Sequence, residues 1–137
     1  MDLSAIQAKY PGLKTFVFGD SKDLCNALTE LVIRGEKIAT CEALGAYTSG
    51  EEQMPVLGRV DLALTWEKKP AVAIRTTEIE IKKFHEVDEG FALDEGENTD
   101  LAGWRKDHQD YFERIGHFDL EMKVVCERFE VVEVYLR

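Results

Sequence analysis

The stretch Gly35-Glu36-Lys37-Ile38-Ala39-Thr40 marks the point at which the chain changes from a helical pattern to a strand pattern. Before it, apolar side chains recur at helical spacing over residues 24–32, and Asp20 or Ser21 can cap this helix. Gly35 stands where a residue of left-handed conformation commonly ends a helix. The stretch therefore predicts a turn that leads from a helix into a sheet.

Downstream of this turn the pattern is that of short strands. Apolar residues alternate over residues 60–66, which predicts a half-buried strand, and residues 67–70 predict a hairpin turn. The apolar positions then change from even to odd near Thr76-Thr77, as they do at a bulge or at the corner of a barrel. Residues 122–136 predict one long strand, or two strands joined at a bulge.

Helical patterns flank the strands. The first residues predict a short helix ending at Pro11-Gly12, and residues 101–115 predict an amphipathic helix ended by Gly116. Residues 90–100 are acidic and are expected to form an exposed loop or lid. The order of elements predicts an α+β fold in which helices flank a curled sheet, and the length fits one domain over residues 1–137.

The charge of the chain limits its ligands. There are 17 Lys and Arg residues against 27 Asp and Glu residues, which gives a formal net charge of −10. Non-specific nucleic-acid binding depends on cationic surface and on counterion release, so this composition argues against a general binder of polyanions. We expect either a local basic spot that meets RNA or a ligand that is small.

The sequence also predicts a cytoplasmic chain without a metal ion or other cofactor. It does not open on a basic segment followed by an apolar run, and no apolar run approaches the roughly 18 residues needed to span a membrane. Cys25, Cys41 and Cys126 form no CxxC pair, which suits a reducing compartment. The three histidines form no HxxxH or HExxH pattern.

The opening stretch resembles the G-x-K-x-x-T motif of the ASCH family, which is part of the PUA-like superfamily. The resemblance, to the longer bacterial type, runs from about Phe16 to Val132. Five further segments match in order, and this ordered set is more specific than the motif alone. They are Phe18–Ser21, Ala73–Ile79, Phe91–Glu97, Trp104–His108 and Val125–Phe129.

The resemblance implies a PUA-like curled β-barrel flanked by helices, with a cleft that binds RNA or a nucleoside. Some similar proteins are amidohydrolases that remove acyl groups from N4-acylated cytidine, and one has been described as a ribonuclease. By this resemblance the catalytic residues would be Lys37, Thr40 and Glu95, and Glu97 competes with Glu95 for the role of the carboxylate. Glu42 stands where many members carry an arginine, which weakens the expectation of phosphate binding there.

Amide hydrolysis needs a nucleophile, a proton acceptor and a donor near the oxyanion. The Thr40 hydroxyl becomes a nucleophile only when a base takes its proton, and Lys37 is a base only if its pKa is lowered. On a regular strand the side chains of Lys37 and Thr40 would point to opposite faces. Cooperation therefore requires either an irregular segment after Gly35 or a lysine stem that curls over.

Other side chains are candidates for ligand binding. Tyr47, expected in a loop, offers a flat stacking surface. Arg75, Arg105 and Arg128 could each meet a phosphate or a base edge; Arg75 could equally pair with a nearby carboxylate. A structural hydrogen bond is the alternative for Arg105. Because Glu127 and Arg128 alternate along a strand, only one of them is expected to face the interior or the cleft.

Trp104 and His108 lie on or beside the apolar stripe of their helix, so core packing and a structural hydrogen bond are the expected roles.

Four hypotheses follow. The cleft could belong to a hydrolase of N4-acylated cytidine, to an RNA-binding module without chemistry, to a ribonuclease, or to a scaffold whose cleft is vestigial. The acidic surplus favours the first, because a nucleoside needs no basic groove. The expected partner is RNA or a modified nucleoside, and the sequence makes no prediction of oligomeric state.

Overall fold

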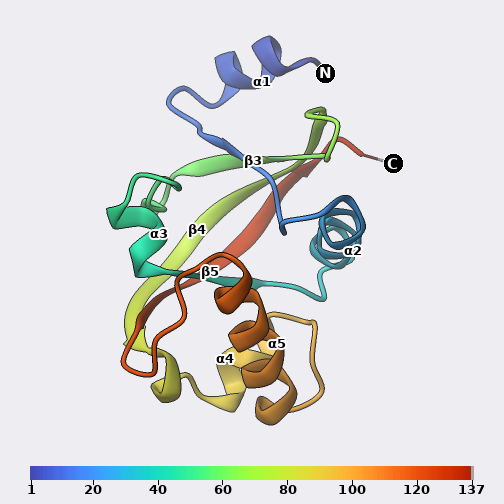
Figure 1. The fold of residues 1–137 in the computed structure, drawn as a ribbon. Helices are drawn as coiled ribbons and strands as arrows, with labels where there is room; N and C mark the ends of the chain where they lie inside the picture. Colours follow the sequence, from blue (N-terminus) through green and yellow to red (C-terminus); the bar gives the residue numbers. More distant parts are fainter. Residues whose placement is uncertain (137) are drawn as a thin grey trace.

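A five-stranded sheet in the order β1-β3-β4-β5-β2 forms the centre of the molecule, and helices lie on both of its faces (Figure 1). The computed structural model describes residues 1–136; Arg137 lies outside the described part. The strands are β1 Thr15–Phe16, β2 Ala39–Ala43, β3 Val60–Leu64, β4 Pro70–Lys83 and β5 Lys123–Val134. The helices are α1 Leu3–Lys9, α2 Lys22–Ile33, α3 Leu44–Thr48, α4 Glu89–Asp94 and α5 Leu101–Arg114, with a 3₁₀ turn, η1, at Phe84–Glu86.

The sheet is curled but open. β1 pairs with β3 in parallel, and the other neighbours are antiparallel. β1 and β2 form the two edges, and within residues 1–136 they do not pair with each other. The α+β fold with a curled sheet is confirmed, whereas the expected closure into a barrel is not. Closure would need strand pairing between the two edges, and β1 is only two residues long.

The expected change of face in β4 is a bulge. Thr76 pairs with Phe129 and Glu78 pairs with Arg128, so Thr77 has no residue opposite it on β5. The extra residue turns the side chains that follow to the other face of the sheet and increases the bend of the strand. The predicted long final strand, β5, is continuous over Lys123–Val134. Its pairing with β4 shifts a second time between Ala73 and Ile74, near the end of β5.

The turn between α2 and β2 forms as the sequence predicts. The Ser21 hydroxyl accepts a hydrogen bond of 3.2 Å from the Leu24 amide and so caps α2. At the other end, Gly35 has φ +78°, and its amide donates to the carbonyl of Val32 at 3.0 Å. Glycine adopts this left-handed conformation without steric cost, so the chain can leave the helix sharply and enter the sheet.

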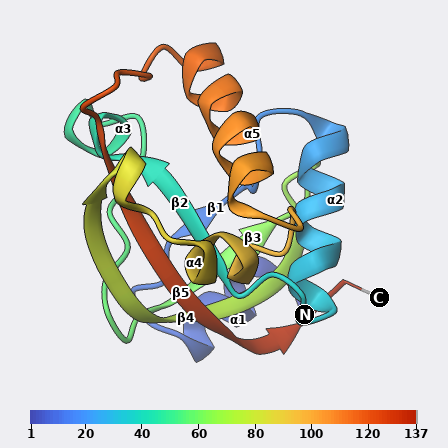
Figure 2. The same cartoon turned by 90° about the horizontal axis from the view of Figure 1, so that it is seen from below.

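The helices cover different parts of the sheet (Figure 2). α4 and α5 pack against β2 and the start of β5, whereas α2 packs against β4 and β5 further along. β3 is buried over its whole length, because α1 covers one face and α2 the other; the expectation of a half-buried strand was therefore wrong. None of the described helices is long and apolar enough to cross a membrane.

Residues 90–100 differ from the expected exposed loop. Their first half belongs to α4, which Asp88 caps through a hydrogen bond of 2.8 Å to the Phe91 amide. Phe91 and Ala92 are buried in the apolar cluster that includes Trp104, and Glu95 is 1% exposed. Although the segment is acidic in composition, its two apolar residues Phe91 and Ala92 pack into the core and hold it against the rest of the molecule.

Candidate active site

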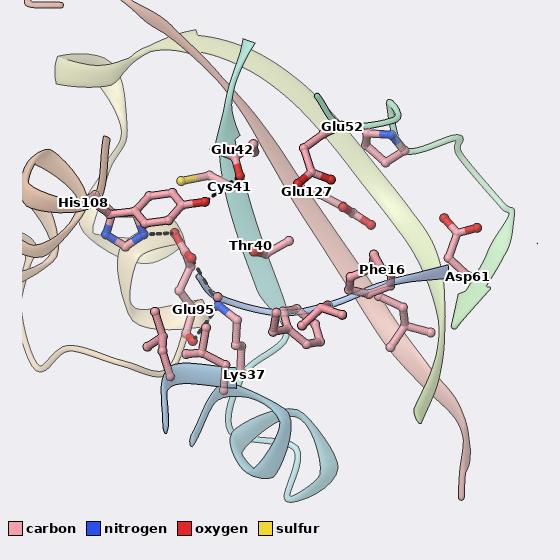
Figure 3. A pocket seen from close by; sticks show the side chains of 18 of the residues that line it. Phe16, Lys37, Thr40, Cys41, Glu42, Glu52, Asp61, Glu95, His108 and Glu127 are labelled. Carbon is pink, nitrogen blue, oxygen red and sulfur yellow. Dashed lines mark hydrogen bonds and ion pairs between the residues drawn. The ribbon is translucent and has the colours of Figure 1, made fainter. Parts of the chain in front are cut away.

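A cleft opens between the concave side of the sheet, α2 and α5 (Figure 3). Its volume is about 610 Å³, which is within the range of pockets that hold small ligands. β1, β2, α3, α5 and β5 all contribute residues to its lining. Segments that are distant in the sequence therefore meet around one cavity, large enough for a single nucleoside.

Lys37 lies in an irregular segment between α2 and β2. Its amide donates to the Leu31 carbonyl at 3.1 Å, and the next amide, of Ile38, donates to the Asp94 carbonyl at 2.9 Å. Strand β2 begins only at residue 39, so the alternation of a regular strand does not apply to Lys37. Both Lys37 and Thr40 therefore line the cleft, as their cooperation requires.

The Lys37 ammonium is held between two carboxylates. Nζ lies 3.2 Å from Oε1 of Glu95 and 2.8 Å from Oε2 of Glu97, and it also donates to the Glu95 carbonyl at 3.3 Å. The side chain of Lys37 is 1% exposed, that of Glu95 2% and that of Glu97 24%. Glu95 and Glu97 thus share the lysine instead of competing for one position.

Gly96 makes this arrangement possible. It lies between the two carboxylates with φ +76°, and a Cβ atom at this position would collide with the Glu36 carbonyl oxygen. Only glycine allows the backbone after α4 to approach the backbone before β2 so closely. The approach brings both carboxylates within reach of Lys37.

Two aromatic side chains of α5 hold Glu95 from the other side. Trp104 Nε1 donates to Oε2 of Glu95 at 2.6 Å, and Nε2 of His108 lies 3.3 Å from the same oxygen. His108 Nδ1 is 2.9 Å from the Trp104 carbonyl, and the two rings stack with centroids 4.2 Å apart. Both side chains pack in the core, as expected, and both also position the buried carboxylate.

These contacts favour the charged forms of Lys37 and Glu95. Burial alone would lower the pKa of Lys37, but Glu95 and Glu97 together raise it above its usual value. Burial would likewise raise the pKa of Glu95, but Lys37 and then His108 hold it below its usual range. For His108, the nearby Glu95 outweighs burial and raises the pKa. Lys37 is therefore held in its charged form, with all three N–H groups already donating, and it is poorly suited to act as a resting base.

Thr40 lies directly opposite Glu127 on the neighbouring strand, and both side chains line the cleft. The Thr76 hydroxyl donates to Oε2 of Glu127 at 2.7 Å, while Oε1 has no hydrogen-bond partner among the described residues. Burial raises the pKa of Glu127, and the nearby Asp61 adds to this effect. Glu127 occupies the cleft face of β5, and Arg128 occupies the other face.

Tyr47 also lines the cleft, although it belongs to the short helix α3 and not to a loop. Burial and the neighbouring carboxylates Glu42 and Glu127 raise its pKa. Phe16 and Phe18 contribute further rings, with their centroids 4.9 Å apart. The cleft thus offers several flat apolar surfaces to a planar ligand.

Three predicted ligand-binding arginines do not line this cleft. Arg75 pairs with Glu130 at 3.2 Å on the neighbouring strand, and Arg105 donates to a backbone carbonyl at 3.3 Å. Arg128 pairs with Asp94 at 3.0 Å and also with Glu78. In each case a nearby acceptor outside the cavity already engages the guanidinium.

Cys41, Glu95 and His108 place one potential metal ligand each within 4.8 Å of one another. The chemistry of the group favours a hydrogen-bonded network over a metal site. Burial and then Glu95 raise the pKa of Cys41 well above its usual value, which opposes the thiolate that a metal requires. Both oxygens of Glu95 already accept hydrogen bonds from Lys37 and Trp104.

Comparison with known proteins identifies the family. The family model described as "ASCH domain" matches residues 14–133. The chain belongs to the ASCH domain family. An ASCH domain of Lactobacillus crispatus is 30% identical with a TM-score of 0.79, covering 93% of this chain and 84% of its own. No curated protein matches.

Two further solved structures share the ASCH fold. Protein EF3133 of Enterococcus faecalis is 35% identical with a TM-score of 0.82, covering 98% of this chain and 92% of its own. A mutant ASCH protein of Zymomonas mobilis has a TM-score of 0.54 at 10% identity, covering 90% of this chain and 73% of its own. The last comparison extends to the fold alone.

Sequence reasoning named Lys37, Thr40, Glu95, Glu97 and Tyr47, and this ASCH domain brings all five to one cleft. It did not predict that Glu127 lines the cleft or that His108 contacts Glu95. The alternation of β5 required one of residues 127 and 128 to face inward, but only the pairing of β5 with β2 selects Glu127. Several further carboxylates of the lining come from segments with no motif.

Proposed function

We propose that the cleft binds a nucleobase, a nucleoside or the end of an RNA, and that it hydrolyses N4-acylated cytidine. The observation that carries the proposal is the buried Lys37 ammonium, fixed by Glu95 and Glu97 beside Thr40 in a cavity of nucleoside size. A buried, charged donor next to a hydroxyl is what acyl transfer needs for the oxyanion and the nucleophile.

In the proposed reaction the Thr40 oxygen attacks the acyl carbon. The bond between that carbon and N4 breaks, and the hydroxyl proton ends on N4 of the departing cytidine. A water molecule then hydrolyses the Thr40 ester and releases the carboxylic acid. Glu95 and Glu97 raise the pKa of Lys37 and keep it protonated, and in each step the oxyanion would replace the longest of its three hydrogen bonds, the one of 3.3 Å to the Glu95 carbonyl.

The lining of the cleft supports a small ligand over a long RNA. Among residues 1–136, nine carboxylates line it, against four Lys and Arg side chains. Lys37, Arg59 and Arg114 are each paired with a carboxylate already. Few cations are therefore free to neutralise phosphates.

Chromatography of N4-acetylcytidine incubated with the purified protein tests the proposal. We expect cytidine to form with the wild type and with Lys22→Met, a control that removes a lysine 61% exposed on α2. Lys37→Met should form none. Absence of cytidine with the wild type rejects hydrolysis, and cleavage of a labelled RNA in a parallel incubation would support the ribonuclease instead.

A further inference from the structure

We propose that Glu127 recognises a planar ligand edge bearing N–H donors, and that the cleft prefers a cationic or neutral ligand of this kind to an anionic one. The inference rests on the proposed function only in placing the ligand in this cleft. It adds the chemical character of the ligand and the residue that reads it.

The geometry of Glu127 supports this role. Its residue is 9% exposed, and what remains exposed faces the cavity. Thr76 donates to Oε2 and fixes the carboxylate, whereas Oε1 accepts no hydrogen bond from a described residue. Oε1 is open to the cavity, so a ligand N–H that meets it gains a charge-assisted hydrogen bond.

The carboxylates around Glu127 also favour a ligand that donates hydrogen bonds. Glu42 and Glu52 line the same wall, and burial raises the pKa of each. No hydrogen bond or ion pair is formed by the Glu52 carboxylate among the described residues, and Glu42 accepts only from the Ala43 amide and from Tyr111. The guanidinium of Arg59, which also lines the cleft, is bound to Asp61 at 2.7 Å. A ligand carrying positive charge or several N–H groups would relieve this accumulation of acceptors, whereas a phosphate would increase the repulsion.

The position of Glu127 relates recognition to the proposed chemistry. Directly opposed side chains on antiparallel strands have Cβ atoms about 5 Å apart, so a group bound at Glu127 lies next to Thr40. An amide N–H that donates to Glu127 would thus have its acyl carbon close to the Thr40 hydroxyl. Phe16 and Tyr47 line the same cleft and offer flat surfaces to a planar group.

Benzamidine and benzoate are matched probes for this proposal, because they share size and planarity but differ in charge and in N–H donors. We expect calorimetry to detect benzamidine binding to the wild type and benzoate binding at least about tenfold weaker. Glu127→Gln should weaken benzamidine binding by about tenfold or more, since a charge-assisted hydrogen bond is lost. The control Glu130→Gln alters an exposed carboxylate on the same strand and should bind as the wild type does.

Thermal denaturation tests whether Glu127→Gln is folded. If it is not, Glu127→Asp is used in its place, and its shorter side chain should also weaken binding. Undetectable benzamidine binding, equal binding of benzoate, or full affinity in the folded Glu127 variant would each overturn the proposal. Benzamidine binding through Glu127 without any turnover of N4-acetylcytidine would support it and reject the hydrolytic function, so the two failures are distinguishable.

Discussion

Trp104 Nε1 donates a hydrogen bond of 2.6 Å to Glu95 Oε2, while Oε1 of the same carboxylate faces Lys37. The indole therefore acts on the lysine through the carboxylate between them. Because Trp104 is fully buried and stacks on Phe84 and His108, it holds Glu95 in one orientation. The core of the domain and the candidate active site share this side chain.

Trp104→Phe should preserve most of the stacking but remove the donor. We expect a loss of about 1.5–3 kcal/mol in the free energy of unfolding, the usual contribution of a hydrogen bond to a charged group. Urea denaturation followed by circular dichroism measures it. Trp66→Phe is the control, because Trp66 is 38% exposed and lies outside the core clusters. A loss no larger than the control's would show that the bond does not stabilise the fold.

Lys37→Met should destabilise the domain by about 3–5 kcal/mol, because it leaves Glu95 charged and buried without its ammonium partner. The double variant Lys37→Met/Glu95→Gln should recover a large part of that loss, since the orphaned charge is removed. Both variants should lack turnover of N4-acetylcytidine. Denaturation curves and product assays on the three proteins check this, and equal stability of the single and double variants would contradict it.

Gly96→Ala should be more disruptive than Gly58→Ala. Both glycines have positive φ, +76° and +82°, so both variants carry the left-handed strain of about 1–2 kcal/mol. Only at Gly96 would the added Cβ also meet a backbone carbonyl; at Gly58 nothing lies within 4 Å. We expect Gly96→Ala alone to lose ligand binding, because the loop that carries Glu95 and Glu97 must move away from Lys37. Equal melting temperatures for the two variants would disprove the close approach.

The stability of the domain should depend on pH through Glu127. Burial raises the pKa of this carboxyl in the folded state above its pKa in the unfolded chain, which is about 4.3. Ionisation of Glu127 therefore opposes folding as the pH rises above that value. Glu127→Gln keeps an acceptor for Thr76 but cannot ionise. We therefore expect this variant to be more stable than the wild type at pH 7.5, with a difference that shrinks as pH falls toward 4.5. Urea titrations at several pH values test this, and a difference independent of pH would count against it.

Binding of long single-stranded RNA, where it occurs, should depend weakly on salt. Each neutralised phosphate contributes about 0.7 to the slope of log affinity against log salt. Because most cations of the cleft are already paired with carboxylates, we expect a slope on the order of −2 or shallower. Fluorescence anisotropy with a short and a long oligonucleotide measures it. A steep slope that grows with length would reveal an extended basic surface.

The sequence predicted those parts of the fold that depend on neighbouring residues. The cap at Ser21, the left-handed Gly35 and the change of face near Thr77 are all confirmed, because each is set by local sterics and alternation. The burial of both faces of β3 was not predictable in this way. It depends on α1 folding back over the sheet, a contact between distant segments.

The same distinction applies to the cleft. The motif around Lys37 was recognisable because its residues are contiguous. Glu95 was recognisable because residues 91–97 resemble the corresponding segment of the ASCH family. The position of Glu127 depends on the register of β5 against β2, and the contact of His108 with Glu95 depends on how α5 packs. Charge composition correctly indicated an acidic molecule, but only folding gathers nine carboxylates around one cavity.

The pairing of β2 with β5 also has a consequence for the order in which the molecule assembles. Within the described residues, β2 is an edge strand whose single strand neighbour is β5, the fifth strand in sequence order. During synthesis the Lys37 segment leaves the ribosome before β5 does, so Thr40 gains its neighbouring strand only once β5 has been made. Contacts of such long sequence separation form slowly. The cleft is therefore a late product of folding, and a chain interrupted before β5 would carry the lysine motif without the wall that faces it.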